Sequence, residues 1–484
     1  MKKKTLATLI IAIVLVLLLS GGAFLVVYEV YQNKQATKTE EPKYDYETFA
    51  EYTTESIFES IPALIVEGGK IGAAEELGKG SYTLNVSGTT MDDYKAYLAD
   101  LEDKGFKKHS DNGEEGMEGY VYTASFTKDD LVLNVYHIAK YEATYINASK
   151  GTALSDHLVY QDSYMEGAAP DAKTKLHMIE LNDNGNSFVI QLKNGHFIVE
   201  DGGIESDAPY LLDYLEELTP GDEKPVIEAW FMTHAHGDHY GAIKKIMSDV
   251  SYTNRIYVEG VYFVDPSNKV LETQMANESA GTSIWFVMNA SNTFKRQDGS
   301  KSVLYRPSLG QRYYFADMTI DITLTVDQFV NDSWQAADFN DTSTWLMHNI
   351  EGQKFLHAGD AAETGAKYAM DFYDKKYFDL DIFAVLHHGI NVYNYFTDYC
   401  KVKTLLYTSR NVGSLYTATW AARKEENAYL QAAVEESLSH GNGTVVLTFP
   451  YKVGTSETMK PCDWRYTNGK RDGRIWDVIN GRKE

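Results

Sequence analysis

The chain of 484 residues exceeds one ordinary domain and is long enough for a large core with an accessory unit. Its 44% hydrophobic and 24% charged residues are typical of a globular protein. The formal net charge of −24 argues against broad electrostatic binding to nucleic acid or anionic lipid headgroups, although metal ions can still create a local cationic site. Neither Cys400 nor Cys462 has metal-ligand spacing, and the two could form one disulfide outside the cell or stay free.

An apolar segment at the N-terminus predicts a transmembrane anchor over residues 1–32. Leu6–Tyr28 is almost uninterruptedly apolar, and its 23 residues would span about 34 Å as a helix, enough to cross a bilayer with some tilt. Lys2, Lys3 and Lys4 precede this segment and favour the cytoplasmic side, which places the C-terminal part outside the cell. We therefore expect a single-pass protein of the cell membrane, with its N-terminus cytoplasmic and its C-terminal domains extracellular.

A cleavable signal peptide is the competing interpretation of this segment, and it would make the protein secreted. Ser20–Ala23 offers small residues for cleavage after a shorter apolar core. The apolar run continues past that point through Phe24–Tyr28, which favours the uncleaved anchor. Residues 33–46 then turn polar and charged, and we expect them to form a solvated linker.

Residues 47–152 are predicted to form a small α+β accessory domain, built as a β-α-β-β unit. Its helix begins at a weak capping box of Thr90 and Asp93 and ends at Gly105. The expected strands alternate in hydropathy and are Ser81–Val86, Tyr120–Phe126 and Leu131–His137. Aromatic side chains of this domain could mark a saccharide- or wall-binding face, but packing in a two-layer core is favoured. These side chains are Tyr82, Tyr94, Tyr97, Tyr120, Tyr122 and Tyr136.

The most informative motif is His-Ala-His-Gly-Asp-His at residues 234–239. It follows a largely apolar run, Val226–Met232, that is typical of a buried strand. Neutral imidazole and carboxylate oxygen are ligands that suit zinc and similar divalent metals. A strand end that opens into a loop lets alternate residues converge on one point. The motif therefore predicts a metal site.

Three further segments end a predicted strand in chemically active residues. Gly195–Gly203 reads GHFIVEDGG, Phe355–Asp360 reads FLHAGD, and Phe383–Gly389 reads FAVLHHG. Strands alternate with helices in this half of the chain, which suits an α/β layer architecture. Near the C-terminus we expect a strand at Val402–Tyr407, a helix around Ala428–Leu438 and a strand at Val445–Phe449.

The order of these motifs resembles the metallo-β-lactamase superfamily, and most closely the hydrolase-like domain of the ComEC family of competence proteins. Three details favour the ComEC-type branch: GQRYYFAD at Gly310–Asp317, NDTS at Asn340–Ser343, and the doubled histidine His387–His388. The resemblance covers roughly residues 174–455, and it implies an αββα sandwich with metals at one edge. We place the hydrolase domain at residues 174–460 and a C-terminal tail at 461–484.

The resemblance also implies roles for the motif residues. It assigns the first metal to His234 and His236, the second to Asp238, His239 and His388, and a bridging position to Asp360. Asp238 and His387 are the expected catalytic residues. His387 could donate a proton, or it could be the metal ligand in place of His388. Asp201 is expected to orient the histidine loop, with a simple turn residue of the DGG segment as the alternative. His357 lies out of phase with Asp360, so it is interpreted as a core histidine.

One departure from most metallo-hydrolases of this superfamily concerns the region before the GD motif. No histidine stands beside Asn340, Asp341 and Ser343, and His348 lies inside a predicted strand, Trp345–Ile350. The first metal could therefore have only two imidazoles and the bridging carboxylate, with Asn340, Asp341 or water completing it. Fewer imidazoles weaken the selectivity for zinc and make manganese more plausible.

We expect the site to hold two divalent ions, Zn²⁺ or Mn²⁺. Such ions lower the pKa of bound water from 15.7 towards about 7, so the expected reaction is metal-assisted hydrolysis. A phosphodiester on a small molecule, a lipid or the cell wall is the favoured substrate class. The alternatives are an extracellular nuclease of the ComEC type, which the negative charge disfavours, and a carboxamide or thioester hydrolase. A non-catalytic surface-binding protein with a vestigial metal site is the remaining alternative.

Overall fold

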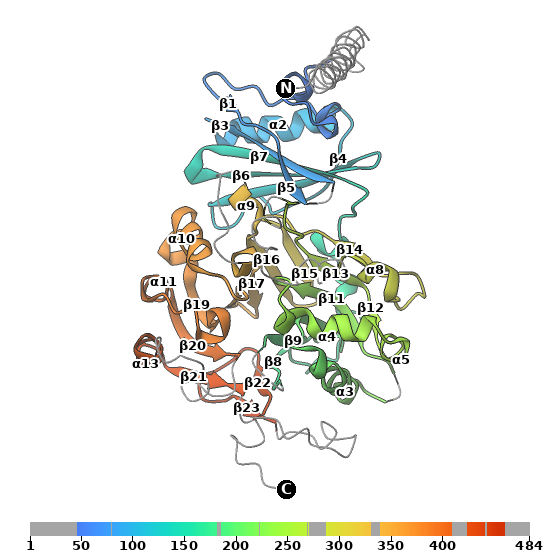
Figure 1. Ribbon diagram of the computed structural model, residues 1–484, viewed down its shortest axis with the longest axis vertical. Coiled ribbons are helices and arrows are strands. Elements are labelled where there is room, and N and C mark those ends of the chain that lie inside the picture. The colour runs from blue at the N-terminus through green and yellow to red at the C-terminus, as the bar shows by residue number, and fades with distance from the viewer. Residues whose placement is uncertain are drawn as a thin grey trace, which may run out of the picture.

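The computed structural model describes residues 46–78, 80–181, 185–221, 223–268, 270, 287–330, 339–408, 424–440 and 443–459. Within these residues the fold is mixed α/β and contains three sheets (Figure 1). The predicted anchor, nearly all of the linker, Cys462 and the C-terminal tail lie outside the described residues. Among the described helices, none combines the length and apolarity needed to cross a bilayer.

The first sheet is antiparallel and lies towards the N-terminus. Its spatial order is β1 (Lys70–Ile71), β3 (Ser81–Ser87), β7 (Ala143–Lys150), β6 (Leu131–Ile138), β5 (Val121–Lys128) and β4 (Lys107–Asp111), with β2 (Glu75–Gly78) also paired to β3. The predicted β-α-β-β unit is therefore incomplete, since β1, β2, β4 and β7 were not expected. β4 escaped prediction because its sequence, KKHSD, is polar throughout.

Helix α2 (Met91–Asp103) covers one face of this sheet. Its N-terminus carries the expected capping box, in which Thr90 and Asp93 exchange side-chain and backbone hydrogen bonds. All of β6 is buried, because Leu133 packs on the α2 side while Tyr136 packs on the opposite side, against the rest of the molecule. The sheet is thus covered on both faces.

The second sheet is mixed, with parallel strands at one side. Its order is β14 (Val303–Tyr305), β13 (Gly260–Phe263), β11 (Val226–Met232), β10 (Phe197–Asp201), β9 (Ser187–Gln191), β8 (Lys175–Met178), β22 (Val445–Thr448) and β23 (Glu457–Thr458), with β12 (Tyr257–Val258) also paired to β11. β10 and β11 are parallel neighbours, so their carboxyl ends meet at one edge.

The third sheet pairs antiparallel strands at one side and parallel strands at the other. Its order is β15 (Arg312–Phe315), β16 (Met318–Leu324), β17 (Trp345–Ile350), β18 (Gln353–His357), β19 (Asp379–Ala384), β20 (Lys401–Tyr407) and β21 (Glu436–Ser439). β18 and β19 are parallel, which again brings two carboxyl ends together. The predicted helix around Ala428–Leu438 is partly wrong, because its second half forms β21.

The second and third sheets pack face to face around one apolar core. Phe188 and Ile198 of the second sheet belong to the same buried cluster as Ile320 and Phe355 of the third. Helices α3 (Ala208–Leu218) and α4 (Gly237–Met247) pack on the outer face of the second sheet, while α10 (Glu363–Phe372), α11 (Asn394–Tyr399) and α13 (Lys424–Ala432) pack on that of the third. The order of layers is helix, sheet, sheet, helix.

Short helices connect these elements. Those with four α-helical residues are α5 (Val250–Thr253), α8 (Ala290–Thr293) and α9 (Asp327–Val330). The 3₁₀ turns are η2 (Phe49–Glu51), η3 (Ser56–Phe58), η4 (Ala139–Tyr141), η5 (Asp156–Leu158), η6 (Asp162–Met165), η7 (Glu205–Asp207), η8 (Phe339–Thr342), η9 (Lys375–Phe378) and η10 (Leu386–Gly389).

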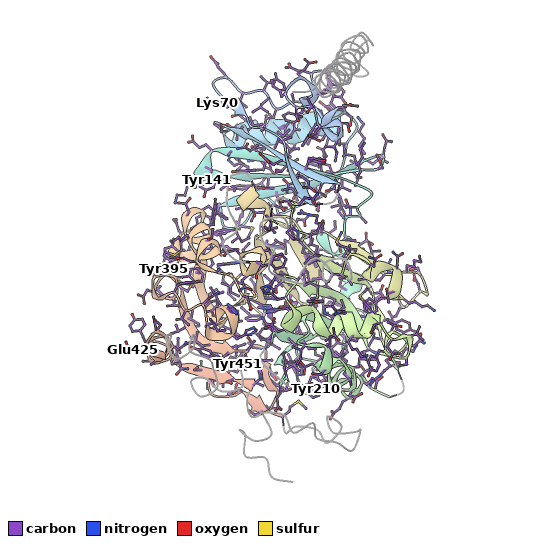
Figure 2. The ribbon with its side chains drawn as sticks, viewed as in Figure 1. Lys70, Tyr141, Tyr210, Tyr395, Glu425 and Tyr451 are labelled. Atoms are coloured by element: carbon purple, nitrogen blue, oxygen red, sulfur yellow. The ribbon has the colours of Figure 1, made fainter. Side chains whose placement is uncertain are left out.

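Buried polar groups join the N-terminal sheet to the sandwich. The Arg306 guanidinium donates two hydrogen bonds of 2.7 Å to the Asp327 carboxylate and one of 3.2 Å to the Leu77 carbonyl of β2. At the surface between the same two parts, Tyr141, which Figure 2 labels, donates to Asp371 of α10. Arg306 and Asp327 both belong to the sandwich and are largely buried, and their ion pair holds the guanidinium where it donates to the Leu77 carbonyl of the N-terminal sheet.

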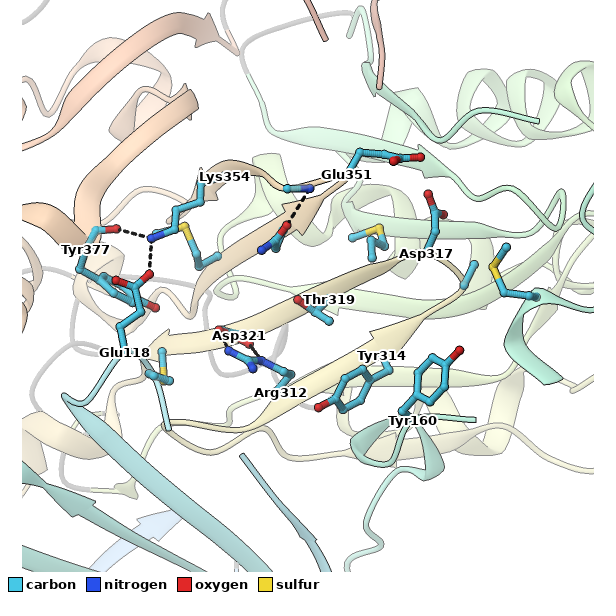
Figure 3. Close-up of a pocket in the computed structure, with 17 residues that line it drawn as sticks. Glu118, Tyr160, Arg312, Tyr314, Asp317, Thr319, Asp321, Glu351, Lys354 and Tyr377 are labelled. Atoms are coloured by element: carbon cyan, nitrogen blue, oxygen red, sulfur yellow. Dashed lines mark hydrogen bonds and ion pairs between the residues drawn. The ribbon is translucent and has the colours of Figure 1, made fainter. Parts of the chain in front are cut away.

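A hollow of about 660 Å³ opens on the outer face of β15 to β18 (Figure 3). Four of its charged side chains form two pairs: Arg312 Nε lies 2.7 Å from Asp321 Oδ1, and Lys354 Nζ lies 2.5 Å from Glu118 Oε1 of the N-terminal part. No predicted site residue lines this hollow. The candidate site lies elsewhere, at the carboxyl ends of the parallel strands.

Candidate metal centre

The second sheet contributes the histidine motif. β11 ends at Met232, the loop Thr233–His236 follows, and α4 begins at Gly237, so Asp238 and His239 lie in the first turn of that helix. Since β10 runs parallel to β11, its last residue, Asp201, lies beside this loop. The motif therefore divides between a loop and a helix start, whereas the sequence suggested a loop alone.

The third sheet contributes the opposite side of the site. β18 leads through Gly359 to Asp360, and β19 leads into η10, where His387 and His388 adopt left-handed backbone angles with φ of 49° and 56°. Gly359 also has a positive φ of 52°, and a Cβ there would lie 2.8 Å from Thr233 Oγ1. Glycine at this position lets the strand end approach the histidine loop closely.

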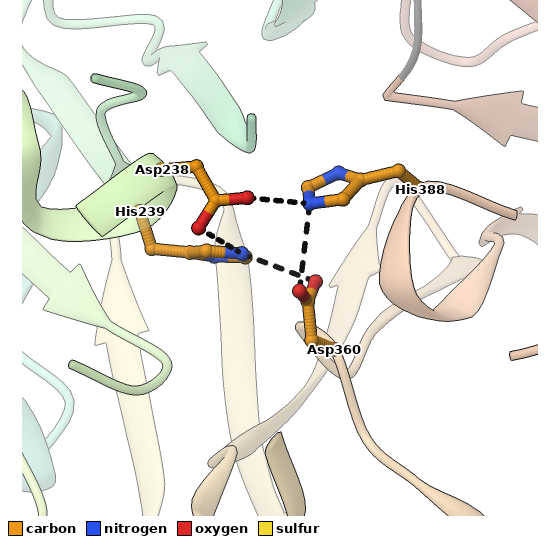
Figure 4. Close-up of side chains that lie close together, drawn as sticks. All are labelled: Asp238, His239, Asp360 and His388. Atoms are coloured by element: carbon orange, nitrogen blue, oxygen red, sulfur yellow. Dashed lines mark hydrogen bonds and ion pairs between the residues drawn. The ribbon is translucent and has the colours of Figure 1, made fainter. Parts of the chain in front are cut away.

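The two sheets bring six of the predicted side chains into one cluster. Asp238, His239, Asp360 and His388 offer ligand atoms that all lie within 4.8 Å of one another. Figure 4 shows these four side chains pointing towards a common centre. A second group with the same property consists of His234, His236 and Asp360. Asp360 belongs to both groups, which is the position expected of a carboxylate that bridges two ions.

Individual distances within the cluster are short. His239 Nε2 lies 3.1 Å from Asp360 Oδ1, and His388 Nε2 lies 3.4 Å from Asp360 Oδ2 and 3.2 Å from Asp238 Oδ2. His239, His388 and Asp360 are almost fully buried, while the Asp238 side chain is 34% exposed. The cluster therefore opens to solvent on the Asp238 side.

Hydrogen bonds fix the orientation of the histidines. Asp201 Oδ2 accepts from His239 Nδ1 at 2.8 Å, and Asp201 Oδ1 accepts from the Thr233 backbone N–H at 2.8 Å. Asp201 thus contacts both the loop and one imidazole. Ser343 Oγ lies 3.3 Å from His234 Nδ1 and accepts from the Asp360 backbone N–H at 3.2 Å.

The donor atoms of the cluster fit divalent cations. Because His239 donates from Nδ1, its Nε2 is left to face Asp360 Oδ1, and neither of these two buried atoms takes part in a hydrogen bond. His234 Nε2 and His236 Nδ1 lie only 3.0 Å apart, so the two ring nitrogens can share one proton or one cation. Nitrogen and carboxylate donors arranged in this way suit zinc or manganese.

The charges of the cluster shift its pKa values strongly. Burial raises the pKa of Asp360, but His239 and His388 outweigh burial and hold it well below its usual range. Burial lowers the pKa of His388, but Asp360 and Asp238 outweigh it and raise the value to about 9. The pKa of His234 lies well below its ordinary value, because burial and His239 both oppose its charge. Metal binding must therefore release protons from the cluster.

His387 and His388 occupy different environments. His388 is buried among the ligand atoms, and its Nδ1 lies 3.0 Å from Thr408 Oγ1. The His387 side chain is 23% exposed, and its Nε2 lies 3.4 Å from Asp360 Oδ2. Asn340 Nδ2 lies 3.5 Å from His387 Nδ1, so the amide N–H can donate there and leave the ring proton on Nε2.

The remaining predicted residue, Asp341, points partly towards α10. Asp341 Oδ1 accepts from the backbone N–H groups of Ala362 and Gly365 at 3.1 and 3.3 Å. A carboxylate at a helix N-terminus stabilises the unpaired N–H groups there. Asp341 therefore positions the helix that follows Asp360.

Sequence reasoning missed a buried polar network beneath the cluster. Glu200 of β10 is fully buried and accepts from His348 of β17 and from His357 Nδ1 of β18, the latter at 2.6 Å. His357 is buried as predicted, but it is hydrogen-bonded rather than packed among apolar groups alone. The available signal was Glu200 itself, because a charge inside the apolar strand FIVED requires a buried partner.

Asn186 connects this network to the motif loops. Its side-chain amide lies 2.8 Å from His357 Nε2, and its backbone carbonyl accepts from Gly202 and Gly203 at 3.0 Å each. Its backbone N–H donates to the Asp238 carbonyl at 3.0 Å. Asn186 therefore joins the DGG turn and the histidine motif of the second sheet to β18 of the third.

Comparison with known proteins gives a family for part of the chain. Residues 182–276, which include the histidine motif, match the family model Lactamase_B, described as the metallo-beta-lactamase superfamily. No curated protein matches the chain.

Solved structures similar to the chain include forms of one enzyme. The metallo-beta-lactamase of Cronobacter sakazakii (Enterobacter sakazakii) with a HARLDQ motif is 14% identical, with 43% of this chain and 76% of that chain covered and a TM-score of 0.25. Two HARLDQ-motif mutants of that protein are 13% and 15% identical, with TM-scores of 0.26 and 0.25. They cover 43% and 41% of this chain and 75% and 70% of theirs.

Proposed function

We propose that this chain, which contains a metallo-β-lactamase superfamily domain with a His/Asp cluster, is a metal-dependent phosphodiesterase. The observation that carries the proposal is the shared position of Asp360 in two groups of ligand atoms. One carboxylate common to two such groups supports a pair of cations, and a pair of cations suits the displacement of an oxygen on phosphorus. The proposed ions are two Zn²⁺ or two Mn²⁺.

The proposed ligands follow from the two groups of side chains. His234, His236 and Asp360 would hold one ion, and Asp238, His239, His388 and Asp360 would hold the other. When bound, the cations would neutralise charge on the substrate and lower the pKa of water.

The chain's own residues would orient these groups and move a proton. Asp201 fixes the His239 ring, and Ser343 contacts both His234 and the Asp360 backbone, so the ligand atoms are preorganised. His387 is a partly exposed imidazole beside the cluster that belongs to neither group of ligand residues, and Asn340 leaves its proton on Nε2. We propose that His387 Nε2 donates a proton to the leaving oxygen.

The substrate is proposed to be a phosphodiester on a small molecule, a lipid or the cell wall. The net charge of −24 disfavours a polynucleotide, because that charge repels a polyanion beyond the reach of the cations. Nuclease activity is therefore ranked below hydrolysis of small phosphodiesters.

A substrate panel on the purified full-length chain tests this proposal. It comprises bis-nitrophenyl phosphate, nitrophenyl-phosphocholine, a chromogenic cephalosporin, a thioester and single-stranded DNA. We expect metal-dependent hydrolysis of at least one phosphodiester, abolished by His236→Ala and unchanged by Asp379→Asn, which alters an exposed carboxylate on β19. Turnover of the cephalosporin without any phosphodiester would reject the assignment, and efficient, salt-sensitive DNA cleavage would replace it with a nuclease.

We also propose that the protein is anchored in the cell membrane by Leu6–Tyr28, with the hydrolase part outside. The apolar length of this segment and the lysines before it support this topology. The mature protein should retain Met1 and sediment with membranes, and protease added to intact protoplasts should digest residues beyond Asn33. A mature N-terminus at Phe24 would show that the segment is a cleaved signal peptide.

A further inference from the structure

A second cluster of metal-ligating residue types lies at the other end of β11 from the histidine motif. It surrounds a cavity of about 330 Å³ between the second sheet and residues 151–174. These residues connect β7 of the N-terminal sheet to β8 of the sandwich and are called the connector. His157 comes from η5 of this connector, Glu228 is the third residue of β11, and His196 directly precedes β10. Because His234 follows the opposite end of β11, this cavity is separate from the candidate metal centre.

Glu228 is a charged residue within an otherwise apolar strand. The register of β10 against β11 pairs Phe197 with Ile227 and Ile198 with Ala229, so Glu228 is the extra residue of a β-bulge. A bulge redirects the side chain that it carries, and bulges are common beside functional sites. Here it turns the Glu228 carboxylate into the cavity, where the side chain is only 8% exposed.

The two oxygens of the Glu228 carboxylate differ in their hydrogen bonds. Oε1 accepts from Asn194 Nδ2 at 2.7 Å and from His196 Nδ1 at 2.8 Å. Oε2 is buried and takes part in no hydrogen bond within the described structure. An oriented carboxylate with one bare oxygen is the arrangement typical of a metal ligand, and leaving a buried charge bare without an ion is costly.

His157 faces the bare oxygen in a matching arrangement. Its Nδ1 lies 2.8 Å from the Tyr314 carbonyl, which can only accept, so Nδ1 carries the proton. The lone pair of Nε2 is then free, and it lies 3.9 Å from Glu228 Oε2, too far for a hydrogen bond. A metal-ligating histidine usually donates its other N–H to a carbonyl or carboxylate in this way.

The surroundings favour a cation between these two atoms. Burial lowers the pKa of His157, which keeps its ring neutral and able to bind a metal. The cavity is also lined by Asp156, Glu166 and Glu259, and its one guanidinium, Arg296, is already paired with Glu259 at 2.9 Å. The charge of the cavity is therefore negative overall.

The Tyr164 ring stacks on His157, with centroids 4.6 Å apart. Its phenol oxygen is buried and has no hydrogen-bond partner among the described residues. It is a further candidate ligand atom from the lining of this cavity, and water can supply others. Separations near 3.9 Å between two ligands suit an ion about 2.0–2.2 Å from each.

We propose that His157 Nε2 and Glu228 Oε2 bind a third divalent transition-metal ion, with water and the Tyr164 phenol as further ligands. One imidazole and one carboxylate select an ion of the Zn²⁺ or Mn²⁺ class. Because His157 belongs to the connector and Glu228 to β11, the ion joins the connector to the second sheet. Its role is to stabilise the contact between the N-terminal part and the sandwich.

Equilibrium dialysis of the full-length chain against Zn²⁺ tests this site without relying on activity. The background is Asp360→Asn, which removes the shared ligand of the candidate centre. In that background we expect about one tight Zn²⁺ per chain, whose affinity falls at least 100-fold on Glu228→Gln and about 10-fold on Asn194→Ala. Glu259→Gln is the matched control, since it removes another carboxylate of the same cavity without losing the ion.

Thermal unfolding supplies an independent readout. Zn²⁺ should raise the Tm of the Asp360→Asn chain and of its Glu259→Gln form, but not of its Glu228→Gln form. If Glu228→Gln does not fold, His157→Gln takes its place in both measurements. Equal Zn²⁺ binding with and without Glu228 would overturn the proposal, as would no binding to the Asp360→Asn chain. Loss of the candidate centre alone would leave this ion in place, so the two sites are tested separately.

Discussion

Glu200 and His348 form a buried ion pair that connects the two sheets of the sandwich directly beneath the candidate metal centre. His348 Nδ1 faces the Phe355 carbonyl at 3.1 Å while Nε2 faces the Glu200 carboxylate, and both partners can only accept. Each ring nitrogen of His348 therefore faces an acceptor. Burial raises the pKa of Glu200, but the neighbouring His348 and His357 outweigh it and lower the value to about 2.

Glu200→Gln should destabilise the fold, because it removes the carboxylate from a buried pair and leaves a neutral amide facing His348 and His357 inside the sandwich. Removing one partner of a buried pair costs about 3–5 kcal/mol of unfolding free energy. Urea unfolding in the presence of a chelator measures this loss without any contribution from bound metal. The double variant Glu200→Gln/His348→Leu should recover part of it, since leucine removes the buried polar ring that has lost its carboxylate partner. A single variant within about 0.5 kcal/mol of the wild type would contradict the pairing.

Asp201→Asn should weaken metal binding without unfolding the chain. The amide cannot accept from His239 Nδ1 and from the Thr233 N–H with the geometry that the carboxylate provides. Loss of such an orienting group typically costs 10–100-fold in metal affinity. Competition with a chromophoric chelator measures the affinity, with Asp379→Asn as the control. Unchanged metal affinity would show that Asp201 does not orient the metal ligands.

The doubled histidine should divide into a ligand and a proton donor. His388→Ala should lower the metal content, because His388 lies buried between Asp238 and Asp360. His387→Ala should keep the metal and lower kcat, since His387 is partly exposed beside the cluster. Metal analysis and steady-state kinetics on the same preparations separate the two effects. The reverse pattern would exchange their roles.

His177 should make the fold sensitive to acid. It is fully buried beside Tyr214, and burial lowers its pKa from 6.5 to about 3. Because the pKa of His177 is lower in the folded state, its neutral form contributes a stability that is fully present above pH 6.5. This contribution to the free energy of unfolding is lost as the pH falls towards 3. Between pH 7 and pH 5 the wild type should lose about 2 kcal/mol more than His177→Phe, as measured by urea unfolding. Equal losses of unfolding free energy in the two chains would show that His177 does not determine the stability between pH 7 and pH 5.

Much of the candidate centre could be predicted because its chemistry is local in the sequence. His234 to His239 follow one strand, and Asp360 and His388 follow two others, and the resemblance of this motif order to the metallo-β-lactamase superfamily implied that they meet. Six of these side chains lie together as the motif order implied. Likewise, hydropathy alternation and a capping box were sufficient to predict α2 and the strands β3, β5 and β6.

The remaining features depend on contacts that no local pattern specifies. β4 is polar throughout and β21 follows a helical segment directly, so neither shows strand periodicity. Glu200 and His348 are 148 positions apart, and only the packing of two sheets brings them together. Similarly, Glu228 and His157 face each other because a bulge and a connector meet, which hydropathy cannot indicate.

The metal content of chains carrying Asp360→Asn tests the central claim most directly. To remove the contribution of the connector site, both chains compared carry Glu228→Gln. After dialysis against metal and then against metal-free buffer, the Glu228→Gln chain should retain about two divalent ions. The Glu228→Gln/Asp360→Asn chain should retain almost none, because the lost carboxylate serves both groups of ligands. Equal metal content in the two chains would contradict a centre built on Asp360.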